Sequence, residues 1–262
     1  MTSYYDLPLL KPPVWTWEVP TYFFIGGAAG MASVLAVAAQ LSGADEKLVR
    51  DARWIAAIGA NLSTPLLIAD LGRPERFLHM LRVFKPQSPM SVGAWTLVAF
   101  GGASTVSAIA PWKPLRDGSS LIAALTGLSM ATYTGVLLGA TAIPVWKEHV
   151  RTLPAHFAAS ALGSAVSLLE LRGHRHRALR SLGLGASLYE TAAGFTLANK
   201  RDLVASALSG PVPFALRLFG RRKAAAAATL LGSLLTRFAW VEAGKESAKN
   251  AHAALTPQRA PA

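Results

Sequence analysis

The segment from Thr64 to Trp95 places chemically versatile side chains between two long apolar stretches. Its sequence is TPLLIADLGRPERFLHMLRVFKPQSPMSVGAW. Carboxylates and imidazoles can exchange protons, and arginines and lysines can bind anions or polar head groups. We therefore take its ionisable residues as the first candidates for function: Asp70, Arg73, Glu75, Arg76, His79, Arg82 and Lys85.

A second group of polar residues lies inside or at the ends of the other apolar stretches. A charge at the centre of a bilayer is costly, so such groups usually face the interior of a helix bundle and pair there. By their positions along the predicted spans, these residues lie toward the side that holds the Thr64–Trp95 connector. The opposite halves of the spans contain few polar residues of this kind. This convergence predicts a polar pocket or a proton path that opens on one side. The residues are Trp17, Glu18, Tyr133, His156, Glu190 and Arg237.

The elements that must position these residues are transmembrane helices. The chain has 262 residues, of which 52% are hydrophobic and 15% are charged, and its mean hydropathy is +0.35. A soluble domain carries about a quarter charged residues, and the apolar runs lack the period-2 alternation of a β-barrel. The composition predicts an all-α, polytopic transmembrane helical bundle of about eight spans, with a short amphipathic connector after the second.

The predicted bundle occupies residues 1–244, and a polar C-terminal tail occupies residues 245–262. The seventh apolar stretch is interrupted by GPVP at residues 210–213, so we predict that this span is broken, short or re-entrant. Because a span needs about 20 apolar residues, the eight are expected near residues 21–41, 52–71, 89–110, 121–145, 154–171, 178–198, 203–219 and 224–241.

The basic residues indicate the orientation of the bundle. Eight spans put both termini on one side, here called side A, together with the Thr64–Trp95 connector. The positive-inside rule favours the more basic side as cytoplasmic, which makes side A periplasmic or external. Membrane orientation and binding of lipid head groups also explain the formal charge of +12 better than binding of nucleic acid does. Half of the 26 lysines and arginines lie on the opposite side, side B, at residues 47–53, 113–116, 172–180 and 217–223.

The absence of cysteine limits the redox chemistry of the chain. Without thiolates it cannot hold an iron–sulfur cluster through cysteine ligands or use a thiol nucleophile. Haem b needs opposed axial histidines on facing helices, and none of the six histidines lies mid-span; the nearest is His156, which has no evident partner. Any metal centre that takes part in redox chemistry is therefore expected in another subunit.

Several candidates also have purely structural explanations. The run from Asp70 to Arg73 is typical of a helix end with a local ion pair. Tyr133 is compatible with a core aromatic residue whose hydroxyl is hydrogen-bonded, and His79 with an interfacial side chain. The small residues of Gly26–Gly30 favour tight helix packing rather than phosphate binding.

Three segments resemble the NrfD-type family, the polysulfide reductase membrane subunits. The first is the Thr64–Trp95 connector, and the others are WTWEVPTYFFIGGAAG at residues 15–30 and YTGVLLGATAIPVW at residues 133–146. Together they cover the first four predicted helices, while the C-terminal half resembles the family in hydropathy alone.

The resemblance implies a quinone-reactive membrane anchor in a bacterial or archaeal cytoplasmic (inner) membrane. It implies a ferredoxin-like iron–sulfur subunit as partner, together with a molybdopterin or other catalytic subunit. The quinone, menaquinone or ubiquinone, would bind near the periplasmic face, and this chain would hold no haem and no iron–sulfur cluster.

The candidate residues then divide into three expected roles. Quinone contact is expected from Tyr133, Trp17, Glu18, His79, Asp70 and Arg73. A proton path is expected through Asp70, His156, Glu190 and Arg237. Docking of the partner is expected on Arg76, Arg82 and Lys85.

The residues are compatible with three functions. The chain can be a quinone-binding subunit of a respiratory oxidoreductase, with electrons passing between the quinone and a cluster in the partner. It can be a proton-translocating module, a role that can coexist with the first. It can also be a passive anchor that only tethers an iron–sulfur protein.

Overall fold

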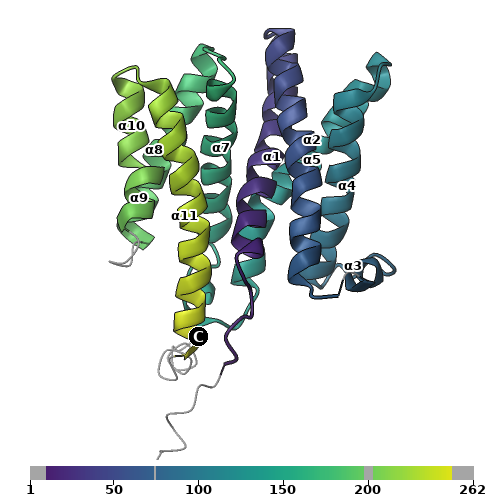
Figure 1. Cartoon of the computed structure of the whole chain (residues 1–262), viewed down its shortest axis with the longest axis vertical. Coiled ribbons are helices and arrows are strands. Elements are labelled where there is room, and N and C mark those ends of the chain that lie inside the picture. Colours follow the sequence, from purple (N-terminus) through teal and green to yellow (C-terminus); the bar gives the residue numbers. More distant parts are fainter. Residues whose placement is uncertain (1–9, 74, 198–202, 250–262) are drawn as a thin grey trace, which may run out of the picture.

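The computed structural model describes residues 10–73, 75–197 and 203–249, and this part of the chain is entirely helical apart from its turns and loops. Figure 1 shows long helices that run up and down between two ends, with the short helix α3 at the lower end. The lower end corresponds to side A. The helices are α1 (Glu18–Leu41), α2 (Glu46–Asp70), α3 (Glu75–Met80), α4 (Pro89–Ile109), α5 (Lys113–Gly139), α6 (Pro144–Glu148), α7 (Leu153–Leu171), α8 (Arg177–Leu197), α9 (Leu203–Ser209), α10 (Pro211–Leu218) and α11 (Arg222–Lys249).

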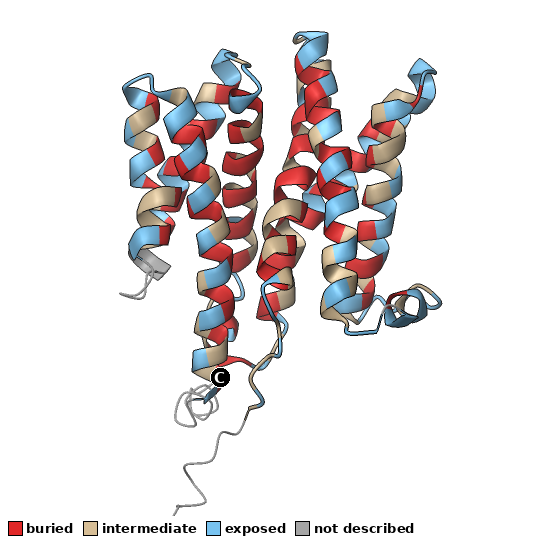
Figure 2. Ribbon diagram, in the orientation of Figure 1, coloured by how far each residue is buried: buried red, intermediate tan, exposed pale blue. Residues whose placement is uncertain are grey.

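The helices form two neighbouring groups. In the first group α1 packs on α2 and α5, and α4 packs on α2 and α5. In the second group α7 packs on α8 and α11, and the pair α9–α10 fills the space beside α8 and α11. Contacts of α7 with α1 and α5 join the two groups, which stand side by side in Figure 1. Buried residues line the surfaces between helices, and exposed residues cover the outside (Figure 2).

The glycine-rich part of α1 serves helix packing, as predicted. Residues Gly26 to Gly30 are all buried. Gly30 approaches Gly127 of α5 so closely that a methyl group on Gly30 would overlap the Gly127 carbonyl oxygen. Small residues at such crossings let two helix backbones come into direct contact.

The chain is an integral membrane protein by the length and apolar character of its helices. Four described helices, α1, α4, α5 and α11, are long and apolar enough to cross a membrane. The long helices α2, α7 and α8 are less apolar than these four, because they carry buried charged residues such as Asp51, Glu170 and Glu190. Because these charges pair inside the bundle, they cost less than charges that face lipid.

The interruption predicted in the seventh stretch is present. α9 ends at Ser209, and α10 begins at Pro211, with Gly210 between them. Pro211 suits the start of α10, because a residue in the first turn of a helix has no helical partner for a backbone N–H group and proline lacks that group. Gly210 packs directly against the backbone of Thr191 in α8. The last helix, α11, extends through Lys249, and the rest of the predicted tail lies outside the described residues.

The expectation that the side-B half carries little polar structure is wrong. Arg217, assigned to a side-B connector from the sequence, is 0% exposed and lies inside the second helix group. Its guanidinium donates to Glu170 Oε2 at 3.2 Å from Nη2 and at 3.3 Å from Nε. The remaining N–H groups reach the hydroxyls of Ser167, Ser187 and Thr229. A spacing pattern in one helix could not reveal this network, because the partners of Arg217 come from three other helices, α7, α8 and α11.

Candidate functional site

The Tyr133 pocket lies between α1, α2, α4 and α5 toward side A. Its cavity volume is about 60 Å³. The lining is mainly apolar, with one carboxylate from Asp70 and two phenols from Tyr22 and Tyr133. The residues that line it are Trp15, Val19, Tyr22, Phe23, Leu67, Asp70, Leu71, Met80, Met90, Gly93, Ala94, Tyr133 and Leu137.

Tyr133 is held in this pocket by two features of α4. Its hydroxyl donates a hydrogen bond to the carbonyl oxygen of Pro89, at 2.8 Å, in the first turn of α4. Its ring lies against Gly93, where a side chain would overlap the phenol. The sequence Pro-Met-Ser-Val-Gly thus supplies both an acceptor for the hydroxyl and the space for the ring.

Asp70 reaches the pocket at the last residue of α2. The helix stops there because Gly72 takes the left-handed conformation, with φ of 67°, that favours glycine after a helix end. Thr16 and Glu18, at the start of α1, lie near enough to Asp70 to interact with its carboxyl group electrostatically. The Thr16 hydroxyl in turn donates to the Glu18 carboxylate. Two carboxylates from distant parts of the sequence therefore lie in the same region of the side-A end.

The other residues predicted for quinone contact lie outside the lining. Trp17 is 60% exposed at the start of α1. Arg73 and His79 are exposed on the α2–α4 connector, and neither makes an ion pair in the described part of the chain. The connector therefore places Met80 and Leu71 at the pocket, while its cations face outward.

The three cations predicted to dock a partner share this outward position. Only Phe77 of α3 is buried, and it anchors the short helix on the bundle. The exposed cations of the connector are Arg73, Arg76, Arg82 and Lys85.

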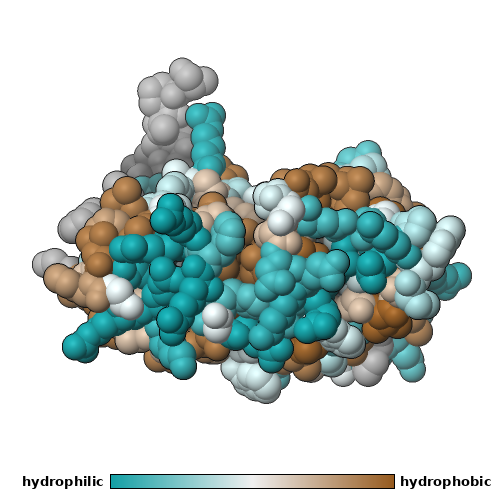
Figure 3. Space-filling model, turned by 90° about the horizontal axis from the view of Figure 1, so that it is seen from above, coloured by the Kyte–Doolittle hydropathy of each residue, from teal (hydrophilic) through white to brown (hydrophobic). Residues whose placement is uncertain are grey.

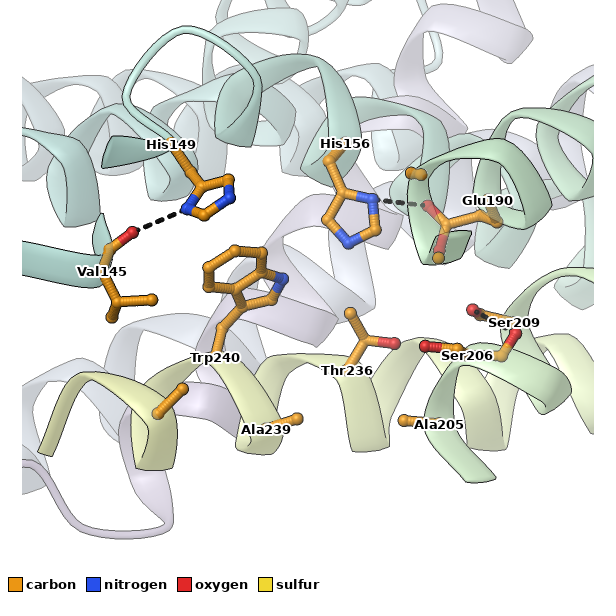
Figure 4. Close-up of a pocket in the computed structure, with 13 residues that line it drawn as sticks. Val145, His149, His156, Glu190, Ala205, Ser206, Ser209, Thr236, Ala239 and Trp240 are labelled. Atoms are coloured by element: carbon orange, nitrogen blue, oxygen red, sulfur yellow. Dashed lines mark hydrogen bonds and ion pairs between the residues drawn. The ribbon is translucent and has the colours of Figure 1, made fainter. Parts of the chain in front are cut away.

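A second cavity, the His156 pocket, lies in the other helix group and also toward side A (Figure 4). His156 Nδ1 lies 3.4 Å from Glu190 Oε1, which joins α7 to α8. His149 Nδ1 donates a hydrogen bond to Val145 O at 2.9 Å, and the imidazole ring lies beside Trp240 of α11. The cavity has a volume of about 60 Å³, and its polar lining includes Ser206, Ser209 and Thr236.

Arg237 supplies the positive charge next to this pocket. It is 1% exposed, and its Nη2 donates to Phe157 O at 3.0 Å. Its guanidinium carbon lies 3.9 Å from the centre of the Phe157 ring, a cation–π geometry. Within the described residues, its Nε and Nη1 and both Glu190 oxygens have no hydrogen-bond partner.

These unpaired groups indicate how the His156 pocket is solvated. Buried polar atoms without a protein partner are usually satisfied by ordered water. A cavity of about 60 Å³ has room for about four to six water molecules, at roughly 10–15 Å³ each. His156, Glu190 and Arg237 thus form a buried cluster that water can connect. Of the four residues predicted for a proton path, the structure brings these three together.

The comparison with known families now decides the identity of the chain. A family model described as polysulfide reductase matches residues 1–251. The chain belongs to the NrfD-type polysulfide reductase family. The resemblance inferred from the first four helices is confirmed, and the match also covers the C-terminal half. A search of curated proteins found no match. Membership makes this chain a membrane subunit of the kind found in oxidoreductase complexes.

An aromatic wall separates the two pockets of this NrfD-type subunit. Phe23 lines the Tyr133 pocket and contacts Phe157, with ring centroids 6.4 Å apart. Phe157 contacts His156 at 6.0 Å in the second pocket. Trp15 stacks on Trp146 at 5.4 Å and closes the wall toward side A. Asp70 is therefore on the opposite side of this wall from the other residues predicted for the proton path.

Sequence reasoning missed several residues of the NrfD-type subunit that line the pockets. Tyr22 stands four residues after Glu18, one helical turn, and this spacing could have indicated it. His149 and Trp240 had no such signal, because their proximity depends on how α6 packs on α11. No three His, Cys, Asp or Glu side chains gather as a metal site within residues 10–73, 75–197 and 203–249.

Proposed function

We propose that the chain is a quinone-binding or quinol-binding membrane subunit that exchanges electrons between the quinone pool and a ferredoxin-like iron–sulfur partner. One observation carries the proposal: Asp70 and Tyr133 line the same apolar pocket near side A. A quinone head group needs hydrogen bonds at its carbonyls and a group that exchanges protons as electrons move. Its isoprenoid tail needs an apolar channel, which the surrounding helices offer.

The proposed chemistry assigns different tasks to the two residues. Reduction of a quinone to a quinol takes up two electrons and two protons, and oxidation releases them. Tyr133 would hydrogen-bond a quinone oxygen in place of Pro89 O, its present partner. Asp70, with Glu18 beside it at the mouth, would pass protons between the ring and side A. The electrons would come from or go to a cluster in the partner, because this chain has no cysteine to ligate one.

Entry of the ring requires the Tyr133 pocket to widen. A cavity of about 60 Å³ holds a few waters and is smaller than a quinone ring. Met80 on α3 and Met90 on α4 line the pocket, and methionine side chains adapt readily because they are unbranched. Met90 is 51% exposed. We expect these two side chains to move when the head group enters.

The exposed cations of the connector supply a surface for the partner. Arg73, Arg76, Arg82 and Lys85 lie within or beside α3, at the same end as the Tyr133 pocket. An acidic face of an iron–sulfur subunit would be attracted to this surface and oriented by it. Docking there would bring the partner's cluster close to the quinone.

The proposal is tested with quinone analogues and two substitutions. Short-chain menaquinone and ubiquinone analogues are titrated against the purified chain, with quenching of tryptophan fluorescence as the signal, since Trp15 lines the pocket. Quinol-dependent reduction of an acceptor is measured on the complex isolated from membranes. Asp70→Asn is expected to slow turnover on the order of 100-fold, the lower range for loss of an acid–base group, and Tyr133→Phe about tenfold, for loss of one hydrogen bond to the quinone.

Matched controls lie outside the pocket. Tyr189→Phe removes a hydroxyl from an exposed tyrosine of α8, and Glu242→Gln removes a carboxylate from an exposed position of α11. Both controls should retain turnover. If Tyr133→Phe and Asp70→Asn also retain it while the complex remains assembled, the passive-anchor function is favoured instead.

A second function is favoured by the His156 pocket. The buried cluster of His156, Glu190 and Arg237 has the unpaired groups and the hydration space that a proton path needs. In proteoliposomes, His156→Phe should keep quinol turnover and abolish only the pH change in excess of the protons that the quinone itself takes up or releases. An excess pH change that persists in this variant would refute proton movement through the cluster.

A further inference from the structure

A third cavity, the side-B hollow, lies at the end of the molecule opposite both pockets. It is bordered by the α1–α2 turn at Gly43 and Ala44 and by the start of α5 at Lys113, Arg116 and Asp117. Its volume is about 470 Å³, larger than either of the other two pockets. Seen from this end, hydrophilic side chains gather over the middle of the molecule, with hydrophobic ones along the edges (Figure 3).

Arg53 forms the rigid base of the side-B hollow. It is buried, with 7% of its surface exposed. Its Nη2 donates to Gln40 Oε1 at 2.6 Å and to Asp117 Oδ1 at 3.0 Å, and its Nε lies 3.4 Å from Ser120 Oγ. These bonds hold three helices together, and they occupy the Asp117 carboxylate that could otherwise neutralise the neighbouring cations.

Three further cations line the side-B hollow without such a partner. Arg50 and Lys113 make no ion pair or side-chain hydrogen bond in the described part of the chain. Arg116 Nε is shielded from solvent, makes no hydrogen bond there, and lies 3.9 Å from the already engaged Asp117. Glu46 is the other carboxylate in the lining. Four cations therefore face two carboxylates, which leaves an excess of positive charge in a recess.

The start of α5 adds to this field. Its first turn has backbone N–H groups with no helical partner, and the residue before it, Trp112, provides no side-chain cap. The positive end of a helix of 27 residues thus lies beside Lys113 and Arg116. The start of α2, in contrast, has a side-chain cap, because Asp45 accepts a hydrogen bond from the backbone N–H of Lys47.

Exposed apolar residues lie next to the side-B hollow along the chain, beside its lining residues Ala108 and Lys113. Ile109, Trp112 and Leu115 are 62%, 65% and 47% exposed at the α4–α5 turn. Tryptophan is enriched where lipid head groups meet the hydrocarbon region. A ligand held by the cations would therefore have acyl-chain surface directly beside its charged group.

The geometry points to a binding site for an anionic phospholipid, with its phosphate in the side-B hollow. The phosphate oxygens would be bound by Arg50, Lys113 and Arg116, and the acyl chains would lie along Ile109 and Leu115. Arginine suits this role because its planar group presents several donors to one phosphate. The lipid would close the gap between the α1–α2 and α4–α5 turns and stabilise the first helix group from the side opposite the Tyr133 pocket.

The test compares lipids and two matched triple variants. The purified full-length chain is delipidated in detergent, and binding of phosphatidylglycerol, cardiolipin and phosphatidylcholine is measured by native mass spectrometry and by the shift in thermal unfolding. The triple variant Arg50→Gln, Lys113→Gln and Arg116→Gln should bind the anionic lipids about 100-fold more weakly, since each basic residue near a membrane surface contributes roughly fivefold.

A control triple variant removes the same charge from another part of side B. Arg175→Gln, Arg221→Gln and Lys223→Gln change exposed residues that do not line the hollow. This variant should bind the anionic lipids as the parent does, and phosphatidylcholine should bind weakly to all three proteins. Equal losses in both triple variants would overturn the site, because binding would then follow net charge alone. Inorganic phosphate that stabilises the parent as much as the lipids do would overturn the assignment to a lipid.

Discussion

The ring of Tyr133 lies against the α-carbon of Gly93, which has no side chain. The Tyr133 hydroxyl donates a hydrogen bond to the carbonyl oxygen of Pro89, four residues before Gly93 in α4. One turn of α4 therefore sets both the depth and the direction of the phenol. This relationship joins α4 to α5 at the point where the two helices border the Tyr133 pocket. It makes the position of the tyrosine depend on a residue that has no functional group of its own.

Gly93→Ala should disturb the site without removing a polar group. The added methyl overlaps the phenol, so the ring must turn away and lose its bond to Pro89 O. We expect weaker binding of quinone analogues, by about tenfold for roughly 1.4 kcal/mol of lost positioning. The measurement is the fluorescence titration described above. Gly101→Ala is the control, because a methyl group there meets open space.

Arg217→Met should be among the most destabilising substitutions in the chain. It leaves Glu170 buried without its counter-charge, which costs about 3–5 kcal/mol. Arg221→Gln, at an exposed position four residues away, should change stability by less than about 0.5 kcal/mol. Chemical denaturation in detergent measures both. Similar denaturation midpoints for the two variants would contradict a stabilising role of the hydrogen-bond network around Arg217.

Glu190→Gln tests the buried cluster of the second helix group. The amide keeps the size of the side chain but removes the negative charge near Arg237. We expect a loss on the order of 3 kcal/mol in the free energy of unfolding, because a buried guanidinium is left without compensation. The double variant Glu190→Gln and Arg237→Met should lose less than the two single variants together. Simple additivity would show that the two side chains do not interact.

The pH dependence of stability should reveal Asp51, which lies in the first two turns of α2, before the apolar segment. Burial alone would raise the pKa of Asp51, but hydrogen bonds from Arg172 and His174 outweigh burial and hold this pKa below its usual value. Because the pKa of Asp51 is lower in the folded protein than in the unfolded chain, its ionised carboxylate stabilises the folded state. This stabilisation is complete at pH values above the pKa in the unfolded chain, about 4. The stabilisation is lost as the pH falls through the folded value.

Asp51→Asn should therefore flatten the acid limb of the stability profile. At neutral pH the variant should be less stable than the parent by about 1 kcal/mol, a modest value because Arg172 is largely exposed. At pH 3 the difference between the two proteins should shrink. Thermal unfolding of both proteins across this range is the measurement. A difference that stays constant with pH would mean that the Asp51 charge contributes nothing.

Much of the fold could be predicted from the sequence because hydropathy and helix punctuation are local properties. Long apolar runs indicated membrane helices, and the Gly26–Gly30 run indicated close packing. GPVP at residues 210–213 marked the break between α9 and α10. These features need no knowledge of which helices touch.

Only the tertiary structure decided how the polar residues are grouped. It separated Asp70 and Tyr133 from His156, Glu190 and Arg237 by placing Phe23 and Phe157 between them. It also moved Arg217 from an expected surface connector into a buried pair with Glu170. The physical reason is that the depth of a residue is set by its place along one helix, whereas its partners are set by the rotation and packing of several helices. Hydropathy along one span carries the first kind of information and not the second.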